Sequence, residues 1–229
     1  MASIRYGFSR LGTHSTGWLK RFLILSIWVF GAFGYACSQT AFSAPVPTPK
    51  LTIVVNNYSQ ASASLLAKAE KEADRIFSGA GLKAVWLNCS TGQPTADEQR
   101  SCQEPVKATD VRLRILSSPV LNKVQDVVFG FAVHPVLASV YYEYVVRLAK
   151  TDEAEFELPI ILGCAIAHEI GHLLLGSNSH FGIGIMQSKW EREQLRHAMM
   201  GTLAFTSEQS KVLGAEVQRR TLTSTAGLP

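Results

Sequence analysis

The segment from Ile160 to Gly176 places the strongest constraint on the fold of this chain. Its seventeen residues are nearly all apolar or small, and the exceptions are His168, Glu169 and His172. A helix that is apolar on every side is a buried one, so other elements must cover it all round. Two imidazoles and a carboxylate inside such a helix are costly to desolvate unless a partner such as a metal compensates them. The segment therefore predicts a core helix with a polar site inside it.

The polar residues of this segment form the pattern H-E-x-x-H, from His168 to His172. Residues i and i+4 of a helix lie on the same face, so both imidazoles can point at a single ion while Glu169 stays outside the ligand set. Imidazole suits Zn²⁺, and a site with three protein ligands leaves one position for water, whose pKa the metal lowers to about 7. Glu169 can then take the proton from that water as it attacks a carbonyl carbon, and deliver it to the departing amine. We expect one catalytic Zn²⁺, with His168 and His172 as ligands and Glu169 as the base.

A third ligand must come from outside this helix. Gly176 follows the last apolar residue, Leu175, and can adopt the left-handed conformation that ends a helix and reverses the chain. His180 follows four residues later and can return to the ion. Beyond it, residues 182–186 form a flexible, apolar loop that ends in Met186. We expect His180 to complete the ligand set.

These residues resemble those of the metzincin zinc endopeptidases, whose pattern is H-E-x-x-H-x-x-G-x-x-H followed by a tight turn with a methionine beneath the metal. The spacing differs here, because the glycine comes one residue late and the third histidine two residues late. An extra helical residue turns the exit point of the helix by about 100°. The family's common tyrosine two positions after the methionine is replaced by Ser188. The order of the motif is nevertheless the same: His168, Glu169, His172, Gly176, His180 and Met186.

The resemblance implies a fold and an activity. The fold is an α+β domain in which a twisted mixed β-sheet packs on a long helix and on the zinc-binding helix, with C-terminal helices after them. The activity is that of a metalloendopeptidase acting on a peptide or protein substrate, with Met186 supporting the floor of the metal site. The domain extends over residues 45–229, and folded structure begins near Lys50.

The rest of the sequence predicts the elements around the buried helix. Apolar residues at spacings of three and four predict an amphipathic helix from Gln60 to about Gly79. Alternating or β-branched apolar residues predict strands at 51–55, 83–87, 111–116, 127–133 and 139–142. Further helices are expected over 143–150, 189–199 and 207–220.

Two alternatives to this interpretation remain open. A carboxylate on the following helix could be the third ligand, as in gluzincin-type peptidases resembling thermolysin, and Glu191 and Glu193 are the candidates. Their ordinary explanation is a solvated helix face shared with neighbouring basic residues. The altered loop spacing also suits a zinc- or peptide-binding module that has lost turnover. Two other histidines have plainer explanations, His134 as a turn residue and His197 as a favourable charge at the end of its helix.

The N-terminal segment, residues 1–44, has the features of a signal peptide. A basic region ends at Arg21, an apolar stretch runs to about Ala36, and small and polar residues follow, so that cleavage is expected after residue 36 or 43. A retained membrane anchor is the alternative, but the apolar run is shorter than the ~20 residues of a spanning helix. We therefore expect a secreted or periplasmic protein with no stable membrane insertion after processing.

Charge gives no support to nucleic-acid binding. The chain has 22 basic and 18 acidic residues, but four of the basic ones and none of the acidic ones lie in residues 1–44, which leaves 18 of each sign elsewhere.

Export also allows paired cysteines to persist. Cys89 and Cys102 flank a polar loop and are expected to form a disulfide that closes it, whereas Cys164 is expected to be a buried thiol.

Overall fold

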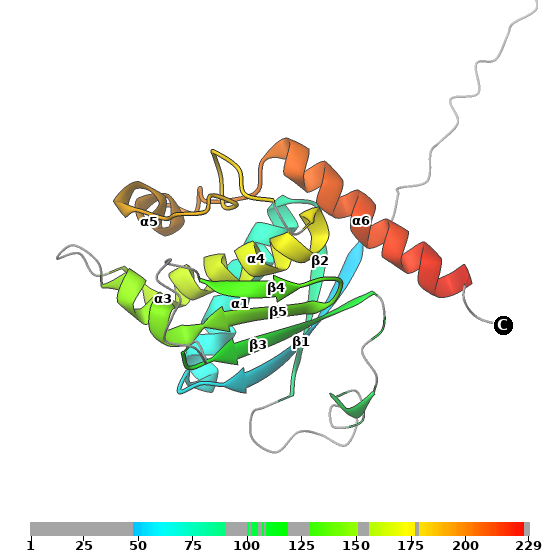
Figure 1. Ribbon diagram of the computed structural model, residues 1–229, viewed down its shortest axis with the longest axis horizontal. Coiled ribbons are helices and arrows are strands. Elements are labelled where there is room, and N and C mark those ends of the chain that lie inside the picture. The colour runs from blue at the N-terminus through cyan, green and yellow to red at the C-terminus, as the bar shows by residue number, and fades with distance from the viewer. Residues whose placement is uncertain are drawn as a thin grey trace, which may run out of the picture. The chain divides into compact units, whose positions relative to one another are not determined.

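The computed structural model describes residues 48–89, 100, 102–104, 107, 109–118, 129–150, 156–176 and 179–226 (Figure 1). The predicted signal peptide and its cleavage sites lie outside these residues. So does the first part of the strand predicted at 127–133.

The described residues form one mixed five-stranded sheet with the order β2-β1-β3-β5-β4. Neighbouring strands among the first four are parallel, whereas β4 runs antiparallel to β5 at one edge. The parallel strands are connected through crossovers, and β4 and β5 are joined by a short turn that contains a cis His134–Pro135 bond. The strands are β1 Lys50–Tyr58, β2 Lys83–Asn88, β3 Asp110–Leu116, β4 Gly130–Val133 and β5 Leu137–Tyr141.

Five helices of this part of the chain agree with the predicted ones in order. Most ends lie within three residues of the expected positions, although α6 continues six residues beyond Arg220. At the start of α1, Ser62 Oγ accepts a hydrogen bond from the Leu65 N–H at 3.3 Å, so the helix begins after this cap. The helices are α1 Ala63–Gly79, α3 Tyr142–Ala149, α4 Leu158–Leu175, α5 Arg192–Met199 and α6 Ser207–Ala226.

The core lies between the sheet and the pair of helices α1 and α4 (Figure 1). In β1, Leu51, Ile53 and Val55 alternate toward this core, as the period of two in a strand requires. The two helices touch at Gly163, where an added Cβ would lie 2.5 Å from the carbonyl oxygen of Ala69. This close crossing brings α4 into the middle of the domain, and the predicted α+β architecture is confirmed.

Among the described helices, only α4 has the length and mean hydropathy, 1.7, of a membrane span. Its surroundings explain this composition, because 72% of the helix is buried inside the domain. The polar residues His168 and Glu169 are buried along with the apolar ones. The apolar run identified in the sequence is thus the central core helix of the fold.

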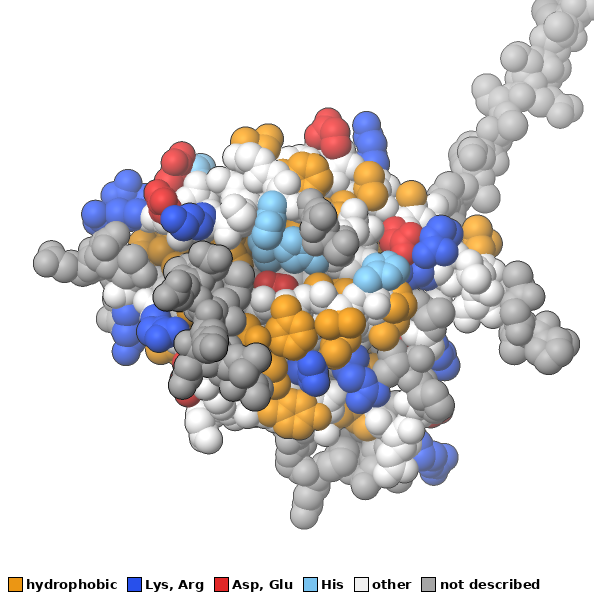
Figure 2. All heavy atoms as spheres, viewed as in Figure 1, with side chains coloured by type: hydrophobic (Ala, Val, Ile, Leu, Met, Phe, Trp, Pro, Cys, Tyr) orange, Lys and Arg blue, Asp and Glu red, His pale blue; other side chains and the backbone are white. Residues whose placement is uncertain are grey.

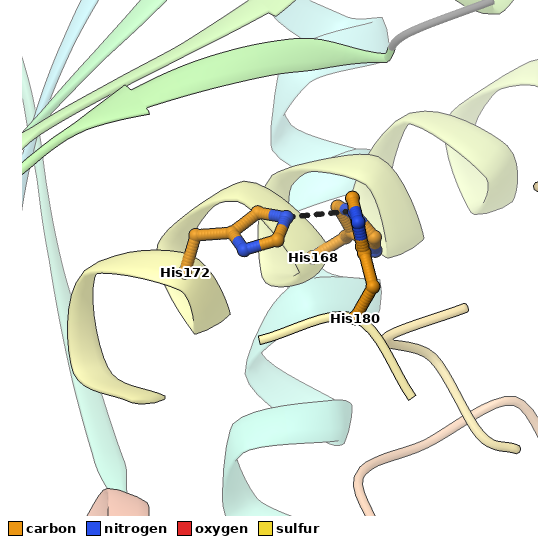
Figure 3. Close-up of side chains that lie close together, drawn as sticks. All are labelled: His168, His172 and His180. Atoms are coloured by element: carbon orange, nitrogen blue, oxygen red, sulfur yellow. Dashed lines mark hydrogen bonds between the residues drawn. The ribbon is translucent and has the colours of Figure 1, made fainter. Parts of the chain in front are cut away.

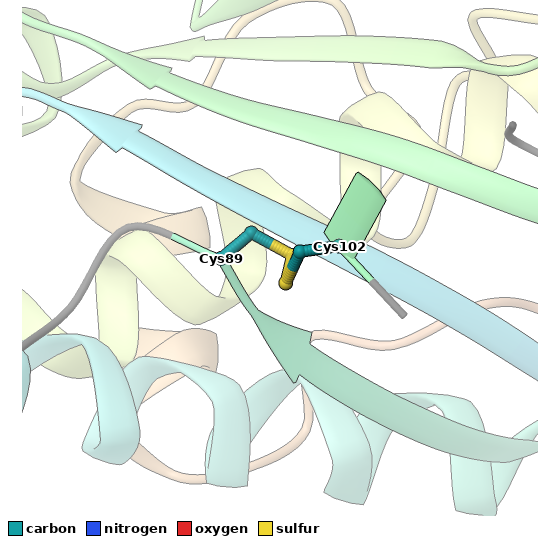
Figure 4. Close-up of a disulfide and its surroundings, with 2 residues drawn as sticks. All are labelled: Cys89 and Cys102. Carbon is teal, nitrogen blue, oxygen red and sulfur yellow. A yellow bond between two sulfur atoms is a disulfide. The ribbon is translucent and has the colours of Figure 1, made fainter. Parts of the chain in front are cut away.

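The structure joins Cys89 and Cys102 in a disulfide (Figure 4). Cys89 directly follows β2, and its N–H donates a hydrogen bond to the Val55 carbonyl of β1 at 2.9 Å. The disulfide therefore connects Cys102 to the end of the central sheet. Cys164 is a buried free thiol, as expected, and burial raises its pKa.

Candidate metal centre

Three histidine side chains converge beside α4 (Figure 3). His168 and His172 come from successive turns of the helix, and His180 comes from the segment that follows it. One ring nitrogen of each lies within 4.8 Å of the others, and the Nε2 atoms of His168 and His172 are 3.1 Å apart. Zn–N bonds of 2.0–2.1 Å in a tetrahedral site put ligand nitrogens about 3.3 Å apart. The donor set and the spacing of its two helical imidazoles therefore fit a zinc ion.

The hydrogen bond of His168 determines which of its nitrogens can bind a metal. Its Nδ1 lies 2.8 Å from the backbone carbonyl oxygen of Ile185. A carbonyl can only accept, so Nδ1 carries the proton and donates it, which leaves the lone pair on Nε2. Nε2 is the atom that faces His172. A partner of this kind orients a metal-binding imidazole and increases its basicity as a ligand.

His172 has a partner of the same type. Its Nδ1 lies 2.9 Å from Ser179 Oγ, so that its Nε2 also faces the cluster. Both partners, Ser179 and Ile185, belong to the segment that follows the helix. The sequence pattern identified the imidazoles but not these two partners, because neither is part of a recognisable spacing.

Burial keeps the histidines of α4 neutral. Burial, together with the neighbouring imidazoles of His172 and His180, lowers the pKa of His168 to about 3, against the opposing effect of the bond to Ile185. Burial also lowers the pKa of His172 to about 4, with a further contribution from His180. Neutral imidazole is the form that binds a metal. His180 is exposed, so it closes the cluster on the solvent side.

Glu169 is 3% exposed and lines the same cavity as the histidines. Burial raises the pKa of its carboxyl group to about 8. A cation close by favours the ionised form and opposes this effect. A carboxyl group whose pKa lies near neutral pH is suited to take up and release a proton.

Met186 packs against the turn of α4 that contains Gly171. It is fully buried, and a Cβ added to Gly171 would lie 2.6 Å from its sulfur. The loop that carries it is closed by a hydrogen bond from the Phe181 N–H to the Met186 carbonyl at 2.9 Å. Gly171, between the two helical histidines, is thus a point of close approach between the loop and the helix.

Gly176 ends α4, as predicted, but with a different conformation. Its φ of 103° is positive, which favours glycine, while its ψ of 160° is extended rather than left-handed helical. Gly176 itself is therefore extended, and His180 joins the cluster although the spacing contains two additional residues.

The cluster opens into a cavity of about 160 Å³. In Figure 2, histidine and acidic side chains lie together in a hollow, with hydrophobic side chains along one side. Strand β4 forms that wall, and Ser188 contributes from the segment after Met186. The lining residues are Phe129, Gly130, Phe131, Ala132, His134, His168, Glu169, His172, His180 and Ser188.

The other candidate ligands lie outside the cluster. Glu191 caps the start of α5, and Glu193 is exposed with an oxygen 3.9 Å from His197 Nε2. His134 occupies the turn after β4 and lines the cavity without joining the group of converging nitrogens. In the part of the chain that the structure describes, His168, His172 and His180 are the one group able to hold a metal.

Comparison with known proteins gives a structural match without a sequence match. No protein-family model and no curated protein matches the sequence. A zinc-dependent peptidase from Methanocorpusculum labreanum superposes with a TM-score of 0.50 at 15% identity, covering 71% of this chain and 99% of that one. The chain shares the fold of that peptidase. An archaemetzincin from Methanopyrus kandleri also matches, with a TM-score of 0.43 at 20% identity, covering 74% of this chain and 96% of that one.

Proposed function

We propose that this protein is a zinc-dependent peptidase that hydrolyses peptide bonds. The observation that carries the proposal is the convergence of His168, His172 and His180 beside a buried glutamate that follows the first of them. The fold shared with a zinc-dependent peptidase supports it. The binding site holds one ion in this proposal, because the described residues provide one such group of ligands.

The chemistry of the donor set supports zinc over harder cations. Three neutral imidazoles suit zinc, whereas magnesium and calcium prefer oxygen ligands. A zinc ion held by these residues would supply Lewis acidity, polarising a substrate carbonyl and lowering the pKa of water. His168 is fixed by the Ile185 carbonyl and His172 by Ser179, so little reorganisation is needed to bind the ion.

Glu169 performs the proton transfers in this proposal. Its carboxylate takes a proton from the attacking water and passes it to the amine that leaves when the peptide bond breaks. Its burial in a mostly apolar wall limits access of bulk water and strengthens its interaction with charges in the site. The tyrosine of the metzincin pattern is absent, and Ser188 lies in the cavity wall in its place.

The position of β4 suggests how an extended substrate binds. In the sheet of described residues β4 is one of the two edge strands, and it borders the cavity that contains Glu169. An edge strand has unpaired backbone groups that can bind an extended peptide by strand addition. We propose that a peptide or protein substrate lies along β4 with its scissile bond above Glu169.

The sequence supports a location outside the cytoplasm. Residues 1–44 have the features of a signal peptide, and a disulfide between Cys89 and Cys102 suits an oxidising compartment. We propose that the protein is secreted or periplasmic.

The second candidate function is a zinc- or peptide-binding module without turnover, which the altered spacing between His172 and His180 favours.

Cleavage of a mixed peptide library by the zinc-loaded protein separates these two functions. We expect cleavage that falls by about 10³-fold or more in Glu169→Gln, which keeps its zinc. Glu193→Gln, which alters an exposed carboxylate on α5, is the matched control and should cleave normally. Stoichiometric zinc without Glu169-dependent cleavage would favour the binding module.

The third ligand is tested by metal content. His180→Ala should lose zinc, whereas Glu193→Ala should retain it. The reverse result would assign the third ligand to α5 and contradict the role proposed for His180.

A further inference from the structure

Arg220 is a buried cation near the end of α6 and does not belong to the metal cluster. Only 3% of this residue is exposed. A buried guanidinium is costly unless its charge and its N–H groups are matched. Three elements supply the matching partners: Glu216 Oε1 lies 2.8 Å from Nε, the Pro135 carbonyl 2.9 Å from Nη1, and the Leu173 carbonyl 2.6 Å from Nη2.

The two carbonyls that Arg220 binds lie on opposite sides of the cleft. Leu173 directly follows His172 and is within the last turn of α4, where carbonyls have no partner inside the helix. Pro135 is in the turn between β4 and β5 and follows His134, which lines the cavity. One planar group thus bridges the helix that carries the candidate ligands and the turn that follows the cavity-lining strand β4.

We propose that Arg220 is a positioning residue that sets the separation between β4 and α4, and with it the width of the substrate cleft. This inference rests on the proposed function, because the cleft is the proposed substrate site. Arg220 contacts neither the metal cluster nor the cavity, and acts through Pro135 and Leu173. An arginine is needed because its rigid fork donates in several fixed directions at once, which a lysine ammonium does not.

Glu216 and Arg219 provide an internal comparison. Glu216 lies one turn before Arg220 and pairs with both arginines. The Arg219 side chain is 61% exposed and makes its two hydrogen bonds with Glu216, whereas Arg220 continues from the same carboxylate to the two carbonyls. Replacing Arg219 therefore removes a cation from the same glutamate without disturbing either wall of the cleft.

The test compares Arg220→Lys and Arg220→Met with two controls on the full chain. Arg219→Met is the charge control, and Val217→Ala, which truncates a buried α6 side chain, is the control for general loosening of the helix. Zinc content, thermal stability, amide hydrogen exchange of β4 and β5, and kcat and KM are measured for each. If the methionine variant does not fold, the lysine variant carries the test.

We expect amide exchange in β4 and the β4–β5 turn to become about tenfold faster in Arg220→Lys, with zinc content unchanged. KM should rise about tenfold while kcat changes by less than about threefold, because the Glu169 environment is preserved. Arg219→Met should show neither effect. Wild-type exchange rates in Arg220→Lys, or the same pattern in Val217→Ala at an equal loss of stability, would overturn the proposal. The exchange result stands apart from turnover, so absence of peptidase activity in the wild type would reject the proposed function and leave the role of Arg220 tested.

Discussion

The two halves of α4 occupy equally buried positions but differ in chemistry. In the first half, from Leu158 to Ile166, the helix is apolar and crosses α1 at Gly163. In the second half, from Ala167 to Leu175, three polar side chains lie in the interior or at its margin. Each helical imidazole there has a partner from the following segment, Ile185 for His168 and Ser179 for His172.

This difference separates residues that stabilise the fold from residues that form the candidate metal centre. An apolar core helix does not need Glu169, whose burial opposes its ionisation. The first half is explained by packing alone, whereas the proposed function explains the second by binding of a cation. Substitutions in the two halves should therefore change different properties of the protein.

The largest effect on stability should come from the pH dependence that Glu169 gives the metal-free protein. Its folded-state pKa of about 8 lies above its ordinary value of 4.5, so its contribution to stability is fully present below pH 4.5 and is lost as pH rises through 8. Metal-free Glu169→Gln should be more stable than the wild type by about 3 kcal/mol at pH 7. Chemical denaturation from pH 4 to 8 measures this difference.

The difference between the two proteins should shrink toward pH 4, where the wild-type carboxyl group is protonated in both states. An equal difference in stability at pH 4 and pH 8 would show that burial does not raise the pKa of Glu169. Burial of Glu169 would then have no electrostatic cost in free energy of unfolding.

A smaller effect is expected at Gly163, in the apolar half. An added methyl group would meet the Ala69 backbone carbonyl, which cannot move like the end of a side chain. Gly163→Ala should lower the free energy of unfolding by about 2 kcal/mol through overpacking, with zinc content unchanged. Gly214→Ala on α6, where nothing lies within 4 Å, is the control and should stabilise the protein by up to about 1 kcal/mol. Equal effects of the two substitutions on thermal unfolding would refute the close crossing of α1 and α4.

The smallest effect on stability is expected at Gly171, in the polar half. A methyl group there meets the Met186 sulfur at 2.6 Å, but this side chain can shift. Overpacking and the better helix propensity of alanine partly cancel, so Gly171→Ala should cost about 1 kcal/mol. Because Met186 packs against the turn of α4 that carries both helical histidines, kcat/KM should fall about tenfold, unlike in Gly163→Ala. Unchanged peptidase activity in Gly171→Ala would show that the contact of Met186 with α4 does not affect catalysis.

The elements around α4 were predictable from local patterns. Periodicity identified α1, an unbroken apolar run identified α4, and alternating or β-branched residues identified most strands. The i, i+4 spacing identified His168 and His172, because all these patterns depend on residues close in sequence. The sequence order of His180 after Gly176 also anticipated which side chains converge.

Contacts between distant segments could not be predicted in this way. The edge position of β4 depends on which strands pair, and the bonds from Arg220 to Pro135 and Leu173 join residues 85 and 47 positions apart. Ser179 was not identified, since a serine in a loop has no pattern that marks it as the partner of His172. The extended conformation of Gly176 was not predicted either, because a glycine after a helix allows several backbone conformations.

Zinc stoichiometry decides whether the three histidines form a metal centre. Purified, processed protein should contain one zinc ion per chain by elemental analysis, or take up one ion on titration, and His168→Ala should bind none under the same conditions. A wild-type protein that contains no transition metal and takes up none at any ratio would contradict the account, because the buried imidazoles and Glu169 would then lack the cation that explains them.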